Sequence, residues 1–180
     1  MKNKRSLFFA FLLISISSTV TAKETDIFEA ARQSDVSAIK AYVLEGNDIN
    51  VVNSKAYTPF ILAAYYGHTQ ALEALLQAGA DACTIDKKGN NAFMGVAFKG
   101  HDQVAKWLLE NTGCNVNHQN YAGQTALMMA SLFGREEMIK LLLEHGANKD
   151  LVDNQGNTSI KLAQAQGLSR VVEIIQFHLQ

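Results

Sequence analysis

The feature that most constrains the fold of this chain is an internal repeat of about 33 residues. Four ten-residue segments align on a shared closing glycine, and the glycines lie 33, 34 and 33 residues apart. These glycines are Gly67, Gly100, Gly134 and Gly167. A fixed period of this length is typical of solenoids, in which one supersecondary unit stacks on the next. Because a unit this short cannot bury its apolar face alone, the sequence predicts that neighbouring copies complete each other's core.

Each copy predicts two helices that are joined at its glycine. A second apolar segment follows every closing glycine, and its large side chains recur at the helical spacing of three or four residues, as in residues 71–76. Three of these second helices are expected to end at Gly79, Gly113 and Gly146, because a helix often stops at a left-handed glycine.

An earlier copy is degenerate but in register. Residues 25–34 match the first helix of the repeat, and residues 38–43 match the second. The sequence therefore predicts an all-α chain of about five helix-turn-helix repeats. Their boundaries are expected at about 24–52, 53–85, 86–119, 120–152 and 153–180.

The predicted first helices begin at residues that can cap them. A side-chain oxygen at the N-cap accepts an otherwise unpaired backbone N–H and stabilises the helix by about 1 kcal/mol. The residues in this position are Thr58, Asn91, Thr125 and Thr158. Pro59 follows the first of them, at a position where the missing N–H of proline has no cost.

Together these features resemble the ankyrin repeat, whose pattern is a β-turn, Thr-Pro-Leu-His-x-Ala-Ala, a glycine, a second helix and Leu-Leu-x-x-Gly-Ala-x-x-Asn. The direct matches are Thr58-Pro59, Ala63-Ala64, Gly79-Ala80, Gly146-Ala147 and Val116-Asn117. The chain departs from the pattern in lacking its histidine, and in one extra residue near Thr112 that could alter a loop. The resemblance covers residues 24–178 and implies an ankyrin-repeat solenoid.

A solenoid needs end repeats with polar outer faces. The first copy carries Glu24, Arg32, Lys40 and Glu45. The last copy carries Lys161, Gln164, Gln166, Arg170 and Gln176. Both sets are expected to be polar end caps, which favours a solenoid that is complete at five repeats.

Residues 1–22 have the features of a cleavable signal peptide. Three basic residues among the first five precede an apolar run over residues 7–16, which is too short to span a bilayer comfortably. Small residues before Lys23 predict cleavage after Ala22 and a periplasmic or secreted mature chain, residues 23–180, with no later membrane-spanning segment. The alternative is an N-terminal anchor that stays uncut.

Charge and motifs argue against several functions. The formal net charge is −1, and loss of the signal peptide leaves 13 Lys and Arg against 17 Asp and Glu, so no nucleic-acid partner is expected. No catalytic motif such as Gly-x-Ser-x-Gly, a P-loop or His-Glu-x-x-His is present, and we predict that the chain is not an enzyme. His68 and His101 occupy the same repeat position and are predicted to be structural; neither a metal nor a cofactor is expected.

The two cysteines of the chain, Cys83 and Cys114, fall in neighbouring repeats at positions three residues out of register. A disulfide requires Cα atoms within about 7 Å of each other. Because repeat stacking combined with this offset argues against such an approach, we expect two buried, unpaired thiols.

The resemblance implies that a protein partner binds the concave face, the surface made by the β-turn tips and the ends of the first helices. Aromatic residues with nearby lysines are typical of binding hot spots. The residues of this face predicted to bind a partner are Tyr57, Tyr65, Tyr66, Lys87, Lys88, Phe98, Lys99, Tyr121, Leu132 and Phe133. The alternative is that several of these rings pack between repeats as core.

The predicted function is therefore that of an exported, monomeric protein-binding module. One alternative is an inhibitor or immunity protein that neutralises a toxin or hydrolase in the same compartment. A second alternative, implied only by resemblance to small exported bacterial ankyrin proteins, is a haem or catalase-supporting accessory in peroxide defence.

Overall fold

A computed structural model describes residues 26–178 of the chain, and in this range it contains ten helices. The predicted signal peptide and Glu24 lie outside the described residues. The helices are α1 (Ile27–Gln33), α2 (Val36–Leu44), α3 (Pro59–Tyr66), α4 (Thr69–Gln77), α5 (Ala92–Lys99), α6 (Asp102–Asn111), α7 (Ala126–Leu132), α8 (Glu136–Glu144), α9 (Ser159–Ala165) and α10 (Ser169–Phe177).

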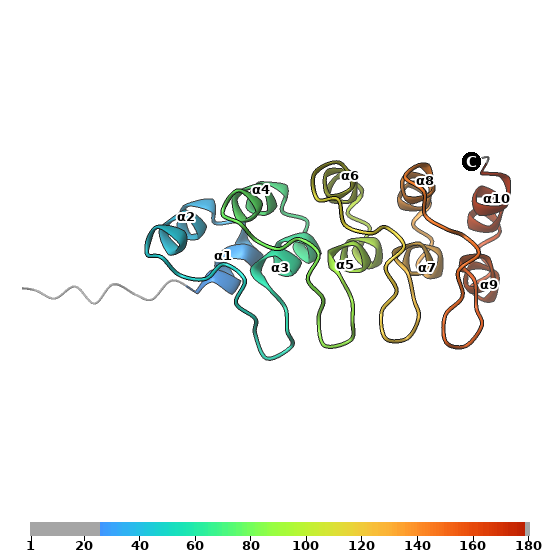
Figure 1. Ribbon diagram of the computed structural model, residues 1–180. Coiled ribbons are helices and arrows are strands. Elements are labelled where there is room, and N and C mark those ends of the chain that lie inside the picture. The colour runs from blue at the N-terminus through green and yellow to red at the C-terminus, as the bar shows by residue number, and fades with distance from the viewer. Residues whose placement is uncertain (1–25, 179–180) are drawn as a thin grey trace, which may run out of the picture.

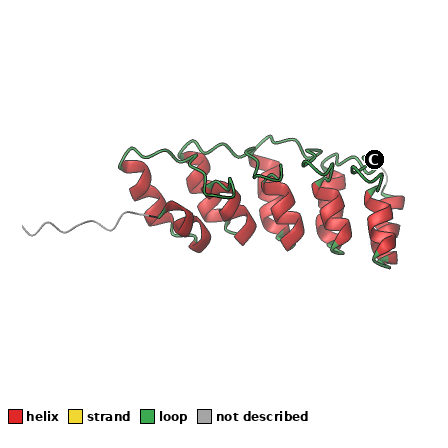
Figure 2. Cartoon of the chain, turned by 90° about the horizontal axis from the view of Figure 1, so that it is seen from below, coloured by secondary structure: helices red, strands yellow, loops and turns green. Residues whose placement is uncertain are grey.

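The ten helices form five antiparallel pairs that stack in a row (Figure 1). The first helices, α1, α3, α5, α7 and α9, contact one another in sequence, and the second helices do the same in a separate layer. Seen from below, the connecting loops gather along one edge of the helices (Figure 2). The predicted all-α solenoid of helix-turn-helix repeats is confirmed.

The predicted N-caps are confirmed in all four repeats. The Thr58 and Thr125 hydroxyls each accept the backbone N–H three residues later at 3.2 Å, and the Asn91 side chain does the same at 3.2 Å. Thr158 accepts the N–H of Lys161 at 3.3 Å. Asp26 caps α1 by accepting two backbone N–H groups.

A residue with a positive φ angle lies one or two positions after the last residue of each first helix, as the closing glycines predict. Gly67 has φ 84°, and a Cβ atom added to it would come within 3.0 Å of the His101 ring of the next repeat. The glycine therefore allows both the left-handed turn and the close approach of the following repeat. In the degenerate first copy, Ser34 adopts the same conformation at φ 58°.

Adjacent repeats are linked by asparagine side chains that lie just after the second helices. The Asn50 amide donates to the carbonyl oxygen of Gly79 at 3.3 Å, and its oxygen accepts the N–H of Asp81 at 2.8 Å. Asn117 makes the equivalent two bonds to the Gly146 carbonyl at 3.1 Å and the Asn148 N–H at 2.7 Å. One side chain thus ties its own repeat to the helix end of the next.

A disulfide between Cys83 and Cys114 occupies this place between the second and third repeats, so the prediction of two buried, unpaired thiols is wrong. Cys83 follows Gly79 by four residues, as Asn117 follows Gly113, and it therefore stands at the linking position. Cys114 comes directly after the glycine of the next repeat, and the two Cα atoms lie 5.5 Å apart. Cys83 lies four residues after its repeat glycine and Cys114 lies one residue after the next one, which gives the three-residue offset that argued against a bridge. In this fold, the side chain four residues after one glycine contacts the segment at the glycine of the next repeat, so the offset favours the bridge. Cys83 is exposed and Cys114 is half-buried.

The extra residue of the third repeat lengthens a helix rather than a loop. Helix α6 has ten residues, whereas α4 and α8 have nine, and the Thr112 hydroxyl at its end donates to the Leu108 carbonyl at 2.7 Å. Within residues 26–178, no helix is long and apolar enough to cross a membrane.

The end repeats are polar at most of the expected positions, since Lys40, Glu45 and all five residues of the last set are exposed. Two large apolar side chains nevertheless stand in solvent there, Leu44 of α2 and Phe177 of α10. The end surfaces are therefore less uniformly polar than the sequence predicts.

Candidate protein-binding face

The β-turn tips of the concave face share one hydrogen-bonding design. We call residues 53–57, 86–90, 120–124 and 153–157 the fingertips. In each, the side-chain oxygen of the first residue accepts the backbone N–H groups two and four residues later, at 2.7–3.1 Å. The first residues are Asn53, Asp86, Asn120 and Asp153. An amide or a carboxylate oxygen thus fixes every tip from within.

The fingertips also bond to one another through their backbones. The N–H of Lys87 donates to the Lys55 carbonyl at 3.2 Å, and the N–H of Tyr121 donates to the Lys88 carbonyl at 3.1 Å. The N–H of Asn154 continues the chain of bonds to Ala122 at 3.0 Å. Because each tip is held by its neighbour, side chains on this edge are preorganised rather than free to move independently.

An uninterrupted row of aromatic rings crosses the ends of the first helices in the three central repeats. The Tyr65 and Phe98 ring centroids lie 6.4 Å apart, and those of Phe98 and Phe133 lie 4.8 Å apart. Tyr66 extends the row with its centroid 5.4 Å from that of Tyr65. Phe98 is 39% exposed, Phe133 43% and Tyr66 46%, so these rings are not core side chains.

Four lysines accompany the aromatic row: Lys55, Lys87, Lys88 and Lys99. The Lys99 ammonium lies 5.2 Å from the Tyr65 ring centroid, which is within the range of a cation–π contact. Lys55, Lys87 and Lys88 project from the fingertips, where all three are exposed. Among the described residues, none of the four has a carboxylate within salt-bridge distance.

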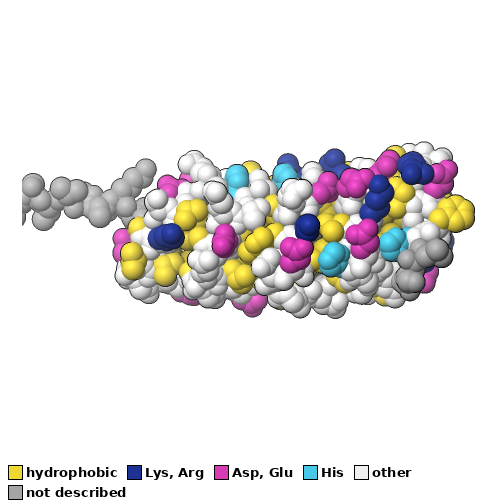
Figure 3. All heavy atoms as spheres, turned by 90° about the horizontal axis from the view of Figure 1, so that it is seen from above, with side chains coloured by type: hydrophobic (Ala, Val, Ile, Leu, Met, Phe, Trp, Pro, Cys, Tyr) yellow, Lys and Arg dark blue, Asp and Glu magenta, His cyan; other side chains and the backbone are white. Residues whose placement is uncertain are grey.

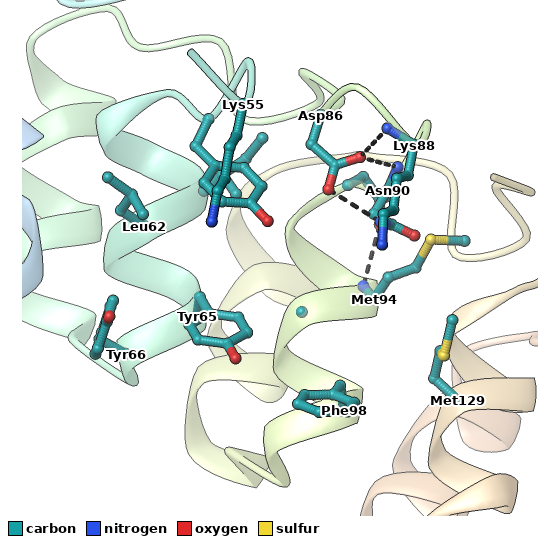
Figure 4. Close-up of a pocket in the computed structure, with 14 residues that line it drawn as sticks. Lys55, Leu62, Tyr65, Tyr66, Asp86, Lys88, Asn90, Met94, Phe98 and Met129 are labelled. Carbon is teal, nitrogen blue, oxygen red and sulfur yellow. Dashed lines mark hydrogen bonds between the residues drawn. The ribbon is translucent and has the colours of Figure 1, made fainter. Parts of the chain in front are cut away.

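A pocket of about 440 Å³ opens between the second and third repeats (Figure 4). Tyr65 and Phe98 line one side of it, while Lys55, Asp86 and Lys88 line the fingertip side. The remaining lining residues are Tyr57, Ile61, Leu62, Tyr66, Asn90, Asn91, Met94, Gly95 and Met129. Its volume falls within the range of ordinary ligand pockets, about 300–1,000 Å³.

Tyr57 and Asp86 are the polar groups whose surroundings at the pocket are best defined. Burial raises the pKa of the Tyr57 hydroxyl above its usual value, and the nearby Asp86 carboxylate and Tyr65 raise it further. Tyr57 is therefore protonated at neutral pH and can donate a hydrogen bond. Both Asp86 oxygens accept bonds from within the fingertip, since Asn90 donates its side-chain amide to one of them at 2.9 Å.

Comparison with known proteins agrees with this architecture. A family model described as ankyrin repeats in three copies matches residues 27–120 and again residues 93–178. The chain belongs to the ankyrin-repeat family. Ankyrin repeats generally mediate protein–protein interaction.

Among curated proteins, this ankyrin-repeat chain is similar to parts of several. It is 35% identical over 75 residues to YahD of Escherichia coli (strain K12), a protein named for ankyrin repeats; the match covers 39% of this chain and 37% of YahD. It is 39% identical over 69 residues to the E3 ubiquitin-protein ligase XBAT33 of Arabidopsis thaliana, covering 38% of this chain and 13% of the ligase. The aligned segments span well under two thirds of these relatives.

The pocket brings together half of the ten ankyrin residues predicted to bind a partner. Tyr57, Tyr65, Tyr66, Lys88 and Phe98 line the pocket. The remaining predicted residues do not line it. Lys87 and Tyr121 lie on fingertips, Lys99 and Phe133 lie along the aromatic row, and Leu132 is half-buried at the end of α7.

Sequence reasoning missed the apolar side chains on the pocket side of the first helices, namely Leu62, Met94 and Met129, and it missed Gly95. The last could have been found by alignment of the copies. The fifth position of the four segments holds Leu62, Gly95, Met129 and Leu162, so one repeat lacks a side chain there.

The ankyrin histidines act as helix and turn partners, which confirms their structural prediction. The Nε2 atom of His68 lies 2.7 Å from the Arg32 carbonyl oxygen, and that of His101 lies 3.1 Å from the Tyr65 carbonyl oxygen. His118 bonds in the same way to Gly89 at 2.8 Å. The His68 and His101 rings therefore each support the preceding repeat, and the His118 ring supports a fingertip. Between residues 26 and 178, no group of three or more metal-ligating side chains is placed to hold a metal ion.

Proposed function

We propose that the chain is an exported protein-binding module that docks its partner on the concave face. The observation that carries the proposal is the continuous row of rings Tyr66, Tyr65, Phe98 and Phe133, of which Tyr65 is half-buried and the other three are exposed. Contiguous apolar surface of this kind usually marks an interaction site, and aromatic side chains are enriched in binding hot spots. The stability of the repeats does not require these rings, since they lie at the helix ends outside the core.

The bonded fingertips support a rigid mode of docking. Because neighbouring tips are tied together by backbone hydrogen bonds, the partner meets a surface that is already arranged for binding. We propose that the protein does this as a monomer, with the aromatic row as anchor and the lysines as its polar rim. It has no catalytic role in this proposal.

Export to the periplasm or the cell exterior is part of the same proposal. The disulfide between Cys83 and Cys114 supports it, because such bridges persist in oxidising compartments and are rare in the cytosol. An inhibitor of a toxin or hydrolase would use the same face, and the identity of a captured partner would distinguish that function from others.

Capture from the native compartment tests the proposal. The mature chain, immobilised, is incubated with a periplasmic or secreted fraction of its own organism, and bound proteins are identified by mass spectrometry. The double variant Tyr66→Ala with Phe133→Ala should retain at least tenfold less of the main partner than the wild type.

The matched control is Phe177→Ala, which removes an aromatic side chain that is 76% exposed on α10, away from the concave face. This variant should capture the partner as the wild type does. Equal capture by the double variant, with an unchanged circular dichroism spectrum, would show that the concave face is not the binding site.

A further inference from the structure

We infer that the pocket above Gly95 receives one large apolar side chain from an acidic segment of the partner protein. The inference rests on the proposed function of the concave face and specifies what that face recognises. Its three supports are the missing side chain at Gly95, the apolar lining around it, and the lysines at its rim.

The pocket is open at Gly95 because glycine has no side chain to fill it. Gly95 lies inside helix α5, where glycine is less favourable than alanine by about 1 kcal/mol. The equivalent positions of the flanking repeats carry Leu62 and Met129, whose side chains form neighbouring parts of the pocket wall. An ideal Cβ at Gly95 would meet only Tyr65, at 3.4 Å. A sequence shaped by stability alone would fill this position, so the gap indicates space kept for a ligand group.

The lining suits a large apolar group. Leu62, Met94 and Met129 supply flexible aliphatic and thioether surface, and Tyr65 and Phe98 supply ring surface (Figure 4). Methionine side chains adapt to ligands of irregular shape and make favourable contacts with aromatic rings. A Phe, Trp or Leu side chain entering here would continue the aromatic row into the interior of the face.

The charge around the pocket favours an acidic occupant. The pocket is flanked by two segments of the second and third repeats, residues 53–67 and 84–100. Together these segments contain four lysines and a single acid, Asp86. Residues 118–134 of the next repeat contain no Asp, Glu, Lys or Arg. The concave face is therefore positive, although the whole chain carries a formal charge of −1. Complementary charge steers a partner to its site and sets its orientation.

The opposite surface shows that this positive character is local. The convex face, formed by the second helices, carries acidic and basic side chains of both signs intermixed (Figure 3). Several of them are paired along one helix, as Lys106 is with Glu110 and Lys140 with Glu137. Unpaired lysines beside an apolar pocket are thus a feature of the concave face.

Ring geometry favours a polypeptide over a single-stranded nucleic acid, which also binds lysine and aromatic side chains. Of the three ring pairs in the row, only Tyr65 and Phe98 are nearly parallel, at 14°. The Tyr65 and Tyr66 ring planes meet at 76°, and those of Phe98 and Phe133 meet at 81°. Rings packed edge to face do not present the series of open parallel faces on which successive bases stack.

A peptide display selection tests the inference. A random twelve-residue library is panned on the immobilised mature chain, and the enriched peptides are synthesised and measured by fluorescence anisotropy. They should combine one Phe, Trp or Leu with two or more Asp or Glu residues, and their affinity should fall with added salt. Gly95→Leu, which fills the pocket, should weaken their binding at least tenfold.

Two control variants accompany this measurement. Gly95→Ala adds only a Cβ atom and should bind the peptides nearly as the wild type does. Lys55→Glu with Lys88→Glu should weaken binding at least tenfold without any change in the core, whereas Lys106→Glu with Lys140→Glu makes the same charge change on the convex face and should have little effect.

The outcomes separate the inference from the proposed function. Enriched peptides without acidic residues, or peptides that bind Gly95→Leu as well as wild type, would overturn the inference; if Tyr66→Ala with Phe133→Ala still abolishes their binding, the concave face keeps its proposed function. Peptides insensitive to every concave-face variant would overturn both. Displacement of the peptides by a fifteen-nucleotide oligothymidylate at micromolar concentration would overturn the inference that the ligand is a polypeptide.

Discussion

At the scale of single residues, a given position of the repeat requires one chemical property, and different residue types that have this property occur there. The first fingertip position needs a side-chain oxygen three bonds from Cα, and Asn53, Asp86, Asn120 and Asp153 all meet that need. The amide does so without charge, whereas the carboxylate of Asp153 makes the last fingertip sensitive to pH. This difference can be measured at the last fingertip.

We predict that Asp153→Asn removes part of the acid sensitivity of the fold. Burial acts to raise the pKa of Asp153, but hydrogen bonds from Asn157 and Gln155 outweigh it and hold the pKa below its usual value. The ionised form therefore contributes stability above the unfolded pKa of about 4, and this is lost as pH falls through the lower folded value. Asparagine keeps the acceptor oxygen and does not titrate.

The free energy of urea-induced unfolding, measured from pH 6 to pH 2.5, checks this prediction. Wild type should lose more stability than Asp153→Asn below about pH 4. The control Asp150→Asn removes the same charge three residues earlier, at an exposed side chain. If both variants follow one pH profile, the fingertip bonds do not cause the effect.

We also predict that Ser34→Gly stabilises the protein by about 1 kcal/mol, because Ser34 alone among the equivalent positions holds a left-handed conformation without being glycine. Thermal and urea unfolding would measure the gain. Ser37→Gly, within helix α2, should have the opposite sign, since glycine there lowers helix propensity. A loss of stability in Ser34→Gly would contradict the argument.

At the scale of elements, the features that could be predicted from the sequence are those that depend on residues close together in the chain. Helices, N-caps and glycine turns follow from residues within one repeat, so Thr58 and Gly67 were informative by themselves. The aromatic row was also predictable, because Tyr65, Phe98 and Phe133 stand near the same helix end in successive copies.

The disulfide and the pocket were not predicted, because both depend on how one repeat meets the next. Cys83 and Cys114 had to be compared with the linking position of Asn117 rather than with each other. Alignment of the copies shows that Gly95 lacks a side chain, but the pocket beside it becomes visible only when the neighbouring Tyr65 is placed in space.

Cys83 occupies the same repeat position as Asn50 and Asn117, and this predicts how the disulfide can be replaced. Cys83→Asn with Cys114→Ala gives the second repeat the asparagine of Asn50 and Asn117, and gives the third repeat the alanine of Ala80. Its amide should recover the two bonds to the next repeat, so this variant should be more stable than Cys83→Ala with Cys114→Ala by about 1–2 kcal/mol. Urea unfolding of the two double variants measures the difference, and equal stability would show that no such link forms.

At the scale of the whole molecule, the chain is a row in which each repeat contacts only its neighbours. Inner repeats bury two faces and end repeats bury one. Helix α2 accordingly has one buried residue, Ile39, whereas α8 has four. Stability should therefore be highest in the central repeats, which are also the repeats that carry the aromatic row and the pocket.

Amide hydrogen exchange should reveal this gradient, with protection greatest from α3 to α8 and lowest in α1, α2 and α10. The disulfide joins residues 31 positions apart, and the loss of chain entropy on cross-linking a loop of that span stabilises a fold by about 3.7 kcal/mol. Reduction should therefore lower protection in α3 to α6, on either side of the bridge, and leave α9 and α10 nearly unchanged. The same reductant should not affect Cys83→Ala with Cys114→Ala. Equal loss of protection in all five pairs would instead show that the array unfolds as one unit, with the bridge acting on every repeat.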